Sequence, residues 1–412
     1  MDKLSPELVR EILSHVRRRD LPDVRLVCRP FSDISVEFLF SEIHTLSTET
    51  GLLSLVALSQ NPRLARLVRE LVLHVDDFKQ LTWHPFVAQV QSQSLQSKEG
   101  PRHNLYMSMK AADRAHFKFS HTPLYTTLLT KALRNLPRLS AVEMRHRQPD
   151  HDDLPRTPWE RNASDLARLF RLERSHGENG ELDDLRAFTA LINAVHDSGT
   201  HLTAFRTDGS IAQRVFRDHE LLSKAAIVFA TCTELELDFS YDHFYDVDAH
   251  IRANPLFDIL APCRRLEQLK LYGTLRLDPA TPFACYFGAH HVWRHLRVLD
   301  FFSLDMHAHE LVDLLARHKA TLRDVSIRCT ALYTGHWDEV MVFMRKELRL
   351  EWFSLGVDLQ DFGEDGEEYS YDERQNEDMM DYVMSGGKRL PRCGEPNSNP
   401  KVGDAEGDGW GL

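Results

Sequence analysis

Apolar residues at the start of the chain recur at intervals of three and four positions, with charged residues between them. Ser5 can cap a helix through its hydroxyl, and Pro6 suits a first helical turn, where no amide donor is needed. The spacing therefore predicts one helix with a single apolar stripe. The residues of this stripe are Leu8, Ile12, Leu13 and Val16.

Two further short helices are predicted before residue 40. Asp20 is a candidate cap for the second helix, and Pro30 should end that helix at Arg29, because the residue before a proline avoids helical geometry. The apolar positions are Leu21, Val24, Val27 and Cys28 in the second helix and Phe31, Ile34 and Phe38 in the third. Three helices this short bury little surface, so the remaining apolar residues predict a partner or a following domain.

The order of these residues resembles an F-box. The matching positions are Leu4, Pro6, Glu7, Leu8, Ile12, Leu13, Asp20, Leu21, Arg25, Leu26, Val27, Cys28, Arg29 and Phe31. The resemblance implies that residues 1–45 form a three-helix domain that docks on a Skp-type adaptor and, through it, on a cullin scaffold of a ubiquitin ligase. The adaptor contacts that we expect are Leu4, Pro6, Leu8, Ile12, Leu13, Leu21, Val24, Val27 and Phe31.

One departure from the F-box pattern is that Ser5 separates Leu4 from Pro6, whereas F-boxes often place proline directly after the first leucine. The same apolar pattern also fits a small helical bundle that packs only on its own chain. In that alternative interpretation the protein is a free-standing interaction scaffold.

A second pattern, LxxLxL with loose apolar substitution, recurs through the rest of the chain. Its instances are Val68, Leu71, Leu73; Leu139, Val142, Met144; the incomplete Leu202, Phe205; Cys232, Leu235, Leu237; Leu266, Leu269, Leu271; Leu296, Leu299, Phe301; Leu322, Val325, Ile327; and Leu350, Phe353, Leu355. From residue 202 onward they begin 30, 34, 30, 26 and 28 residues apart. Near-equal spacing of this kind is typical of repeat proteins.

Helical patterns at 310–317 and 340–346 lie between these predicted strands, so each unit should consist of a strand, a loop and a helix. We interpret residues 60–384 as an irregular, leucine-rich-repeat-like α/β solenoid, which gives a chain of the α+β or α/β class. The asparagine that usually follows the strand in such repeats is missing, and a compact α/β domain with a conventional sheet is the alternative. Loop insertions are predicted near 87–104 and 145–184.

The side chains between the inward-pointing leucines should face outward, because side chains alternate along a strand. On four successive units the outward positions are Glu236, Asp238, Lys270, Tyr272, Asp300, Phe302, Ser326 and Arg328. We expect a protein substrate to bind there, chiefly through Asp238, Lys270, Tyr272, Asp300, Phe302 and Arg328. Tyr272 and Phe302 are the predicted anchors, since aromatic residues often dominate binding energy.

Charge is distributed unevenly along the 412 residues. The formal net charge is −12, and residues 361–412 hold 14 acidic against 5 basic residues. A nearly neutral body with an acidic tail argues against nucleic acid as the main partner, because phosphate binding needs clustered basic residues. The basic run 17–19 is expected to be a solvated helix end, and the Gly-rich and Pro-rich segment 385–412 is expected to be disordered.

The cysteines and the apolar runs bear on the compartment. Six cysteines are scattered along the chain without a CxxC pair and without a secretory leader before them, which favours a reducing environment. Apolar runs long enough to span a bilayer are missing. We therefore expect a protein of the cytoplasm or the nucleus that has no membrane partner.

His307 and His309 form an HxH pair after a predicted strand, which looks like the first metal motif of the amidohydrolases. That family needs further ligands from later strands, and the only later histidines are His318 and His336. A metal-dependent hydrolase is therefore the least favoured interpretation. HExxH, GxSxG, P-loop and GxGxxG motifs are absent from the sequence. We predict no catalytic residue, metal or cofactor, and a non-enzymatic substrate-recognition subunit of an SCF-type ubiquitin ligase.

Overall fold

The computed structural model describes residues 4–75, 117–146, 181–208, 211–212, 218–240, 255–273, 287–356, 359–362 and 368–385, with a few single positions between 107 and 115 and at 215. The chain divides into two compact units, of which unit 1 extends to Cys232 and unit 2 begins at Thr233. Apart from their edges, the predicted insertions near 87–104 and 145–184 and the predicted disordered tail 385–412 lie outside the described residues.

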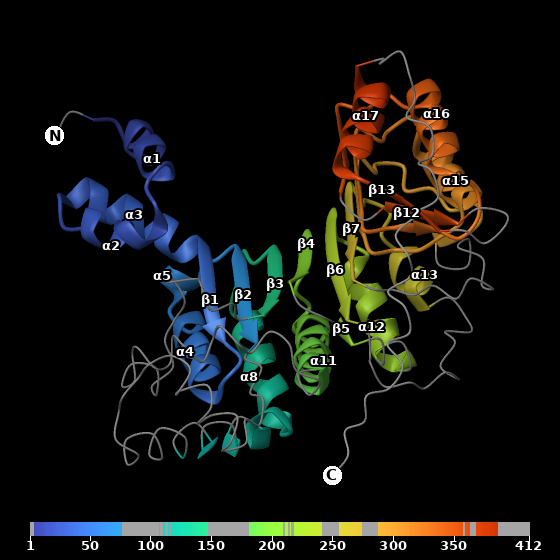
Figure 1. Ribbon diagram of the computed structural model, residues 1–412. Helices are drawn as coiled ribbons and strands as arrows, with labels where there is room; N and C mark the ends of the chain where they lie inside the picture. Colours follow the sequence, from blue (N-terminus) through green and yellow to red (C-terminus); the bar gives the residue numbers. More distant parts are fainter. Residues whose placement is uncertain are drawn as a thin grey trace, which may run out of the picture. The chain divides into compact units, whose positions relative to one another are not determined.

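Unit 1 begins with the helical segment that the sequence predicts (Figure 1). Its elements are α1 (Pro6–Ser14), the 3₁₀ helix η1 (Arg18–Asp20), α2 (Leu21–Val24) and α3 (Arg29–Ser41). Ser5 caps α1 as predicted, since its hydroxyl accepts a hydrogen bond from the Leu8 amide at 3.4 Å. The predicted end of the second helix at Arg29 is wrong. Arg29 begins α3, and Pro30 lies in the first turn of that helix, where a missing amide donor costs nothing.

The start of α2 also differs from the sequence prediction. Asp20 was expected to cap this helix, but its side chain makes no hydrogen bond to the backbone there. Its carboxylate instead accepts a hydrogen bond from the Arg17 Nε at 2.9 Å. The helix α2 therefore starts at Leu21 without a side-chain cap and extends over only 4 residues.

Parallel strands form the centre of unit 1. The strands β1 (Glu42–Leu46), β2 (Glu70–Val75), β3 (Ala141–His146) and β4 (Ala204–Asp208) lie side by side in that order. The other elements are α4 (Glu49–Ser59), α5 (Pro62–Ala65), α8 (Pro123–Arg134), α11 (Glu181–Ser198), β5 (Ile211–Ala212) and α12 (His219–Phe229). Helices α4, α8 and α11 lie along one side of these strands (Figure 1).

The core of unit 1 lies between the strands and these helices. Phe188 of α11 packs edge-on against Phe205 of β4, and the Thr45 hydroxyl of β1 donates to the Gly51 carbonyl of α4. Strand residues that point the same way are fully buried, among them Leu71, Leu73, Val142, Met144 and Phe205. Burial of this apolar side explains why the LxxLxL pattern marks these strands.

The strand β1 lies before the range 60–384 that the sequence predicts for the body. Ser41 is the last residue of α3 and Glu42 is the first residue of β1, so the helical segment continues into the sheet without a loop. The strand β1 was not predicted, because residues 42–46 contain only Ile43 and Leu46 as large apolar positions and do not match the LxxLxL pattern.

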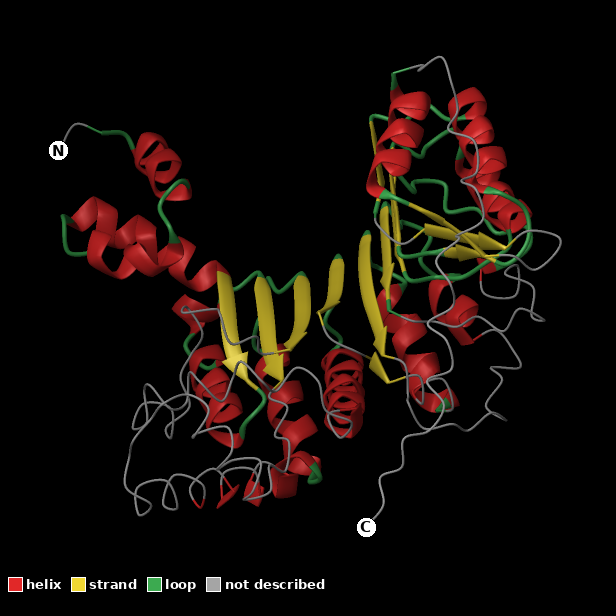
Figure 2. Cartoon of the chain, viewed as in Figure 1, coloured by secondary structure: helices red, strands yellow, loops and turns green. Residues whose placement is uncertain are grey.

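Unit 2 contains a second set of parallel strands. Among its described residues these are β6 (Glu234–Ser240), β7 (Gln268–Tyr272), β8 (Val298–Phe302), β9 (Asp324–Arg328) and β11 (Trp352–Leu355), in that spatial order. Its helices are α13 (Pro255–Leu260), α15 (Ala308–His318), α16 (Trp337–Glu347) and α17 (Glu373–Met384). The strands β10 (Ala331–Leu332), β12 (Leu359–Phe362) and β13 (Glu368–Tyr371) form a small separate sheet (Figure 2).

One backbone arrangement recurs at the start of the strands of unit 2. A carbonyl before one strand accepts two consecutive amides at the start of the next strand, with N to O distances of 2.8–3.2 Å. The accepting residues are Thr233, Glu267, Arg297 and Arg323. In unit 1 the carbonyls of Arg69 and Ser140 likewise accept two consecutive amides. Each predicted LxxLxL position thus coincides with a strand of a parallel α/β arrangement, which confirms the predicted strands.

Three successive strands of unit 2 end in the same unusual backbone conformation. Gly273 follows β7 with φ of 99°, Ser303 follows β8 with φ of 61°, and Cys329 follows β9 with φ of 49°. A side chain at Gly273 would collide with the Phe239 carbonyl, so only glycine fits at that turn. The chain therefore leaves each of these strands by an equivalent left-handed turn.

Candidate functional site

The helical segment has a small apolar core of its own. Its buried residues are Val9, Leu13, Leu21 and Ile34, and Val16, Val24, Phe31, Phe38 and Leu39 pack half-buried against them. Val9 and Leu13 are four residues apart on α1 and so lie on one side of that helix. The core holds the short helices α1, α2 and α3 together.

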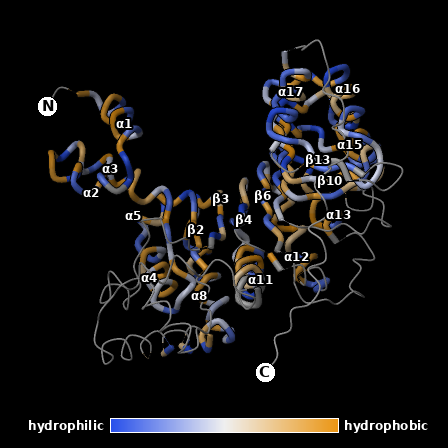
Figure 3. Tube along the Cα trace, in the orientation of Figure 1, coloured by the Kyte–Doolittle hydropathy of each residue, from blue (hydrophilic) through white to orange (hydrophobic). Residues whose placement is uncertain are grey.

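A second set of apolar side chains in this segment faces solvent. Leu4, Leu8 and Ile12 are 41%, 54% and 43% exposed, and Leu26 and Val27 are 85% and 53% exposed. Leu8 and Ile12 are four residues apart on one side of α1, and Leu4 lies just before this helix, while the other two lie in the connection between α2 and α3. Figure 3 shows apolar stretches at both places. We call these five residues the exposed apolar set; patches of this kind mark interaction surfaces.

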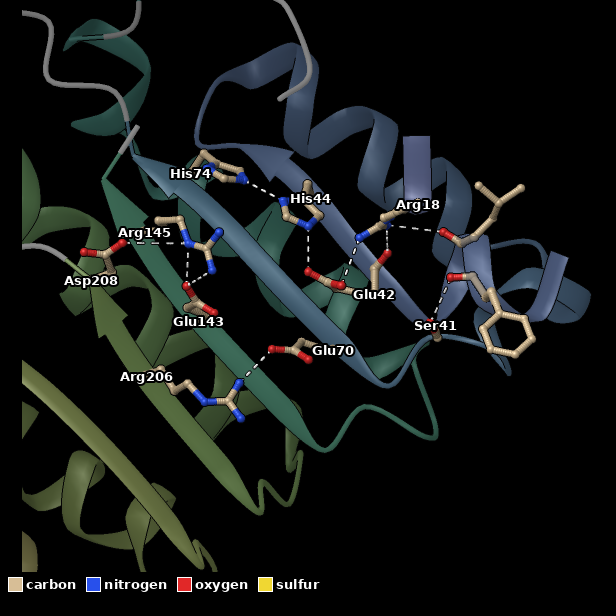
Figure 4. A network of polar contacts seen from close by, with 12 residues as sticks. Arg18, Ser41, Glu42, His44, Glu70, His74, Glu143, Arg145, Arg206 and Asp208 are labelled. Carbon is tan, nitrogen blue, oxygen red and sulfur yellow. Dashed lines mark hydrogen bonds and ion pairs between the residues drawn. The ribbon is translucent and has the colours of Figure 1, made fainter. Parts of the chain in front are cut away.

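Arg18 joins the helical segment to the first strand of unit 1 (Figure 4). Its guanidinium donates to the Leu39 carbonyl at 3.3 Å and to the Glu42 carbonyl, and it lies 3.1 Å from the Glu42 carboxylate. The side chain of Arg18 is about two-thirds buried, so the prediction that the run 17–19 is a solvated helix end is wrong for this residue. A guanidinium fixed at the end of α3 ties the helices to β1.

A polar network continues from Glu42 across the strands of unit 1 (Figure 4). The Nε2 atom of His44 lies 2.7 Å from the Glu42 carboxylate, and its Nδ1 atom lies 2.8 Å from Nε2 of the buried His74. The hydrogen bond from His44 lowers the pKa of Glu42. Arg206 and Glu70 form a further ion pair at 2.8 Å. The network links β1, β2 and β4 through groups that lie far apart in the sequence.

Glu143 and Arg145 extend this network along β3. Glu143 is buried, and its carboxylate lies 2.5 Å from the Arg145 guanidinium, which also lies 3.9 Å from Asp208. Burial raises the pKa of Glu143, while Arg145 acts in the opposite direction. These residues were not predicted from the sequence, although Glu143 and Arg145 alternate with the apolar Val142 and Met144 in AVEMRH, which was a signal for them.

Four of the predicted substrate-binding residues come together in unit 2, and we call them the Arg328 cluster. The Tyr272 hydroxyl donates to the Asp300 carboxylate at 3.0 Å, and Arg328 Nη2 donates to both oxygens of the same carboxylate at 3.1 Å. The Arg328 guanidinium carbon lies 5.6 Å from the Tyr272 ring centre and 5.4 Å from that of Phe302. Burial raises the pKa of Tyr272, so its phenol remains a hydrogen-bond donor.

The two other predicted substrate-binding residues are neighbours of this cluster. Lys270 forms an ion pair with Glu236 at 3.0 Å, and Lys270 is the register partner of Asp300. Asp238 is half-buried and is the register partner of Tyr272. All six side chains thus lie on one side of adjacent strands, but most of their charges are already paired within the unit.

Comparison with known protein families identifies the helical segment. Residues 1–40 match the family model of the F-box domain. The chain contains an F-box. F-box domains bind Skp-type adaptors within cullin-based ubiquitin ligases, and F-box proteins are generally non-catalytic substrate receptors. A search of the curated proteins found no match to the chain.

The structure divides the nine predicted adaptor contacts of the F-box into two groups. The exposed residues are Leu4, Pro6, Leu8, Ile12 and Val27, and the buried or half-buried ones are Leu13, Leu21, Val24 and Phe31. Leu13 and Leu21 belong to the core of the F-box and present no surface to a partner in this conformation. Leu26, which was not among the predicted contacts, is the most exposed large apolar residue of the described chain.

The HxH pair has a structural explanation. The Glu310 carboxylate accepts a hydrogen bond from the His307 amide at 3.4 Å, and His307 Nδ1 lies 2.9 Å from the Thr334 hydroxyl, so His307 is positioned as the residue that starts α15. His309 is exposed. Among the described residues, His, Cys, Asp and Glu side chains do not gather in a group of three that could hold a metal. In the same part of the chain, helices with the length and apolarity needed to cross a bilayer are lacking.

Proposed function

We propose that this protein is the substrate-recognition subunit of an SCF-type ubiquitin ligase. The F-box would bind a Skp-type adaptor and thereby a cullin scaffold, and the rest of the chain would bind a protein substrate. The observation that carries this proposal is the exposed apolar set on an F-box whose own core is complete. We expect this function in the cytoplasm or the nucleus, which stays a prediction.

The exposed apolar set supports adaptor binding for a physical reason. Leu8, Leu26 and Val27 each leave more than half of the side chain in water, although neighbouring apolar residues of the F-box are buried. Covering a side chain of this size with a partner contributes about 1.5–3 kcal/mol. We therefore assign the direct contacts to Leu4, Leu8, Ile12, Leu26 and Val27, and a supporting role to Leu13 and Leu21.

Such a receptor needs no catalytic residue of its own. By holding a substrate lysine near a ubiquitin-loaded conjugating enzyme, it turns a bimolecular encounter into a local one. Its requirements are a firm attachment to the adaptor and a surface that binds the substrate. The contacts of Arg18 with the end of α3 and the start of β1 support the first requirement, because they connect the F-box to the parallel strands of unit 1.

We infer that the substrate surface lies on the outward side chains of β6, β7, β8 and β9 in unit 2. The Arg328 cluster supports this assignment, since it holds two aromatic rings and a guanidinium in fixed positions on a regular sheet. The recurring carbonyl arrangement and the equivalent left-handed turns support a description of the body as an irregular leucine-rich-repeat-like solenoid.

The alternative is an interaction scaffold whose F-box does not enter a ligase. Affinity purification from cells, followed by mass spectrometry, separates the two functions when the full chain is compared with a variant that lacks residues 1–41. We expect the full chain to retain the adaptor, the cullin and further proteins, and the truncated chain to lose only the adaptor and the cullin. Absence of adaptor and cullin from the partners of the full chain would favour the scaffold.

A further inference from the structure

The outward side chains of the unit 2 strands form an acidic surface, which we call the polar sheet face. Its charged members are Glu234, Glu236, Asp238, Asp300 and Asp324 on the acidic side and Lys270 and Arg328 on the basic side. Among the described strand residues of unit 2, five carboxylates thus face two cations, and this balance favours a positively charged ligand.

The Arg328 cluster shows how this face binds a cation. The Arg328 guanidinium is held between a carboxylate, that of Asp300, and the rings of Tyr272 and Phe302. Gly356 makes room for its stem, because a side chain at Gly356 would meet the Cγ atom of Arg328 at 2.5 Å. A carboxylate next to an aromatic ring is therefore a working guanidinium site within this sheet.

A second carboxylate and aromatic pair lies nearer the start of the strands, two residues before the register level of Asp300. Asp324 of β9 and Trp352 of β11 are register partners on adjacent strands, and they lie on the same face as Asp300 and Arg328. Trp352 is 51% exposed. Asp324 has no side-chain hydrogen bond or ion pair to any residue that the structure describes. Unlike the Arg328 cluster, this pair holds no cation of the described chain.

The nearest cation in sequence is already engaged elsewhere. The Arg323 guanidinium donates to the Leu322 carbonyl at 2.6 Å and to the Ala320 carbonyl at 3.1 Å, and its Nε atom lies 3.8 Å from the Glu351 carboxylate. Arg323 is therefore turned away from Asp324 and Trp352 by its own partners.

Trp352 is also accessible along the strand edge. In the described chain β11 is the last strand of its sheet, and α17 packs against it near the far end. There the Asn376 amide donates to the Gly356 carbonyl at 2.8 Å, and the Leu355 amide donates to the Met380 sulfur at 3.2 Å. The helix leaves the beginning of β11, where Trp352 lies, open to solvent.

We propose that Asp324 and Trp352 form a binding subsite for an arginine side chain in a basic segment of the protein substrate. The guanidinium stacks on the Trp352 indole, which is the strongest aromatic partner for a cation, and donates to the Asp324 carboxylate. The acidic excess of the polar sheet face attracts the segment and disfavours acidic ones. This subsite rests on the proposed function, since it specifies the substrate surface of that function.

The test is fluorescence anisotropy at low salt with the full chain and a fluorescein-labelled peptide of Gly-Ser-Arg repeats. The same peptide with Glu in place of Arg serves as the ligand control. We expect the Arg peptide to bind and the Glu peptide not to bind. Asp324→Asn and Trp352→Leu should each weaken the Arg peptide about three- to tenfold, and Trp352→Phe should weaken it less, since a phenyl ring still stacks.

Glu351→Gln is the matched protein control, because it removes one negative charge next to Trp352 from a side chain that is paired with Arg323. It should leave the affinity nearly unchanged. Equal weakening by Glu351→Gln and Asp324→Asn would overturn the subsite in favour of unspecific charge attraction, and unchanged affinity in Asp324→Asn and Trp352→Leu would overturn it as well. The thermal midpoint of each variant shows that the fold is kept.

Adaptor binding, measured on the same preparations, separates this proposal from the proposed function. Binding of the Arg peptide without adaptor binding would retain the subsite and remove the ligase assignment. Adaptor binding together with equal affinity for the Arg and Glu peptides would retain the ligase assignment and remove the subsite.

Discussion

The F-box and the polar sheet face of unit 2 differ in the side chains that they expose to solvent. The F-box buries Leu13 but leaves Leu8 and Leu26 in water, so its surface is completed only by a partner. On the polar sheet face, Arg328 lies over the rings of Tyr272 and Phe302 and is paired with Asp300. Burial of apolar area stabilises a complex without depending on the direction of the contacts. Polar groups contribute to binding only when the ligand offers matching hydrogen-bond or charge partners. The first surface is suited to one constant partner, and the second is suited to selection among partners.

The largest effect is expected where charge replaces exposed apolar groups of the F-box. The double variant Leu26→Asp, Val27→Asp should weaken adaptor binding about a thousandfold, because two charges would enter an apolar interface. Both side chains are exposed, so the thermal midpoint should hardly change. Calorimetric titration with the purified adaptor measures the affinity. Leu53→Asp, at a residue of α4 that is 50% exposed, is the control, and an equal loss there would refute the assignment.

A smaller side chain in the core of the F-box should weaken adaptor binding indirectly, by lowering the stability of the folded domain. Leu13→Ala removes a side chain that is 1% exposed and should cost roughly 2–5 kcal/mol of the free energy of unfolding of this small domain. Saturating adaptor should restore much of the folded population, because the partner binds only the folded form. Hydrogen exchange of α1 amides, with and without adaptor, tests this. Protection that is unchanged in the variant would show that Leu13 is not a core residue.

Acid should weaken unit 2 through His318, which is buried against Trp293. Burial lowers the pKa of His318 to about 4, below its ordinary value of 6.5. Between these values the unfolded chain binds a proton that the folded chain does not, so stability that is present above pH 6.5 is lost as the pH falls towards 4. The loss amounts to at most about 3 kcal/mol.

The variant His318→Gln keeps an acceptor for the Trp293 amide, which donates to His318 Nε2 at 3.1 Å. Urea unfolding of this variant should depend less steeply on pH between 6.5 and 4 than unfolding of the natural chain. Equal pH dependence in both proteins would show that His318 does not titrate in this way. The described part of the F-box offers a contrast, because its histidine, His15, is exposed.

The smallest effect is expected for the Arg328 cluster. Arg328→Met should lower the free energy of unfolding by about 1 kcal/mol, since the ion pair is partly exposed and the Tyr272 hydroxyl still serves Asp300. Arg328→Lys should recover little of this, because an ammonium cannot bridge the carboxylate and the two rings. Urea unfolding measures both variants. A loss of several kcal/mol would place the cluster among the elements that hold unit 2 together.

The sequence was sufficient for the strands that carry the LxxLxL pattern but not for the contacts between their side chains. Apolar triplets such as Leu269, Leu271 and the preceding Leu266 mark a buried strand, because burial on one side demands this period. The ion pair of Arg328 with Asp300 joins residues 28 positions apart. This ion pair depends on the register between the two strands. The register cannot be predicted from the sequence, because the repeats differ in length.

The contact residues of the F-box could also be predicted only in part from the sequence. Periodicity marks Leu8, Ile12 and Leu13 alike as apolar helix positions, but it does not tell which side of α1 meets α2 and α3. Leu26 matches the F-box pattern but was not among the predicted contacts, and the structure places it between α2 and α3. His44 and His74 were missed for a third reason. They lie 30 residues apart in the sequence, and only parallel pairing of β1 with β2 brings them together.

The recurring carbonyl at the strand starts has a consequence for changes in chain length. In unit 2 each accepting carbonyl meets the same two amides of the following strand, whichever residues supply them. Deletion of residues 297–322, one whole repeat, would bring the Arg323 and Asp324 amides to the carbonyl of Glu267, which now accepts from Arg297 and Val298. Insertions or losses of complete repeats can thus be accommodated during evolution, whereas a loss of half a repeat would leave one of these carbonyls and two amides without partners.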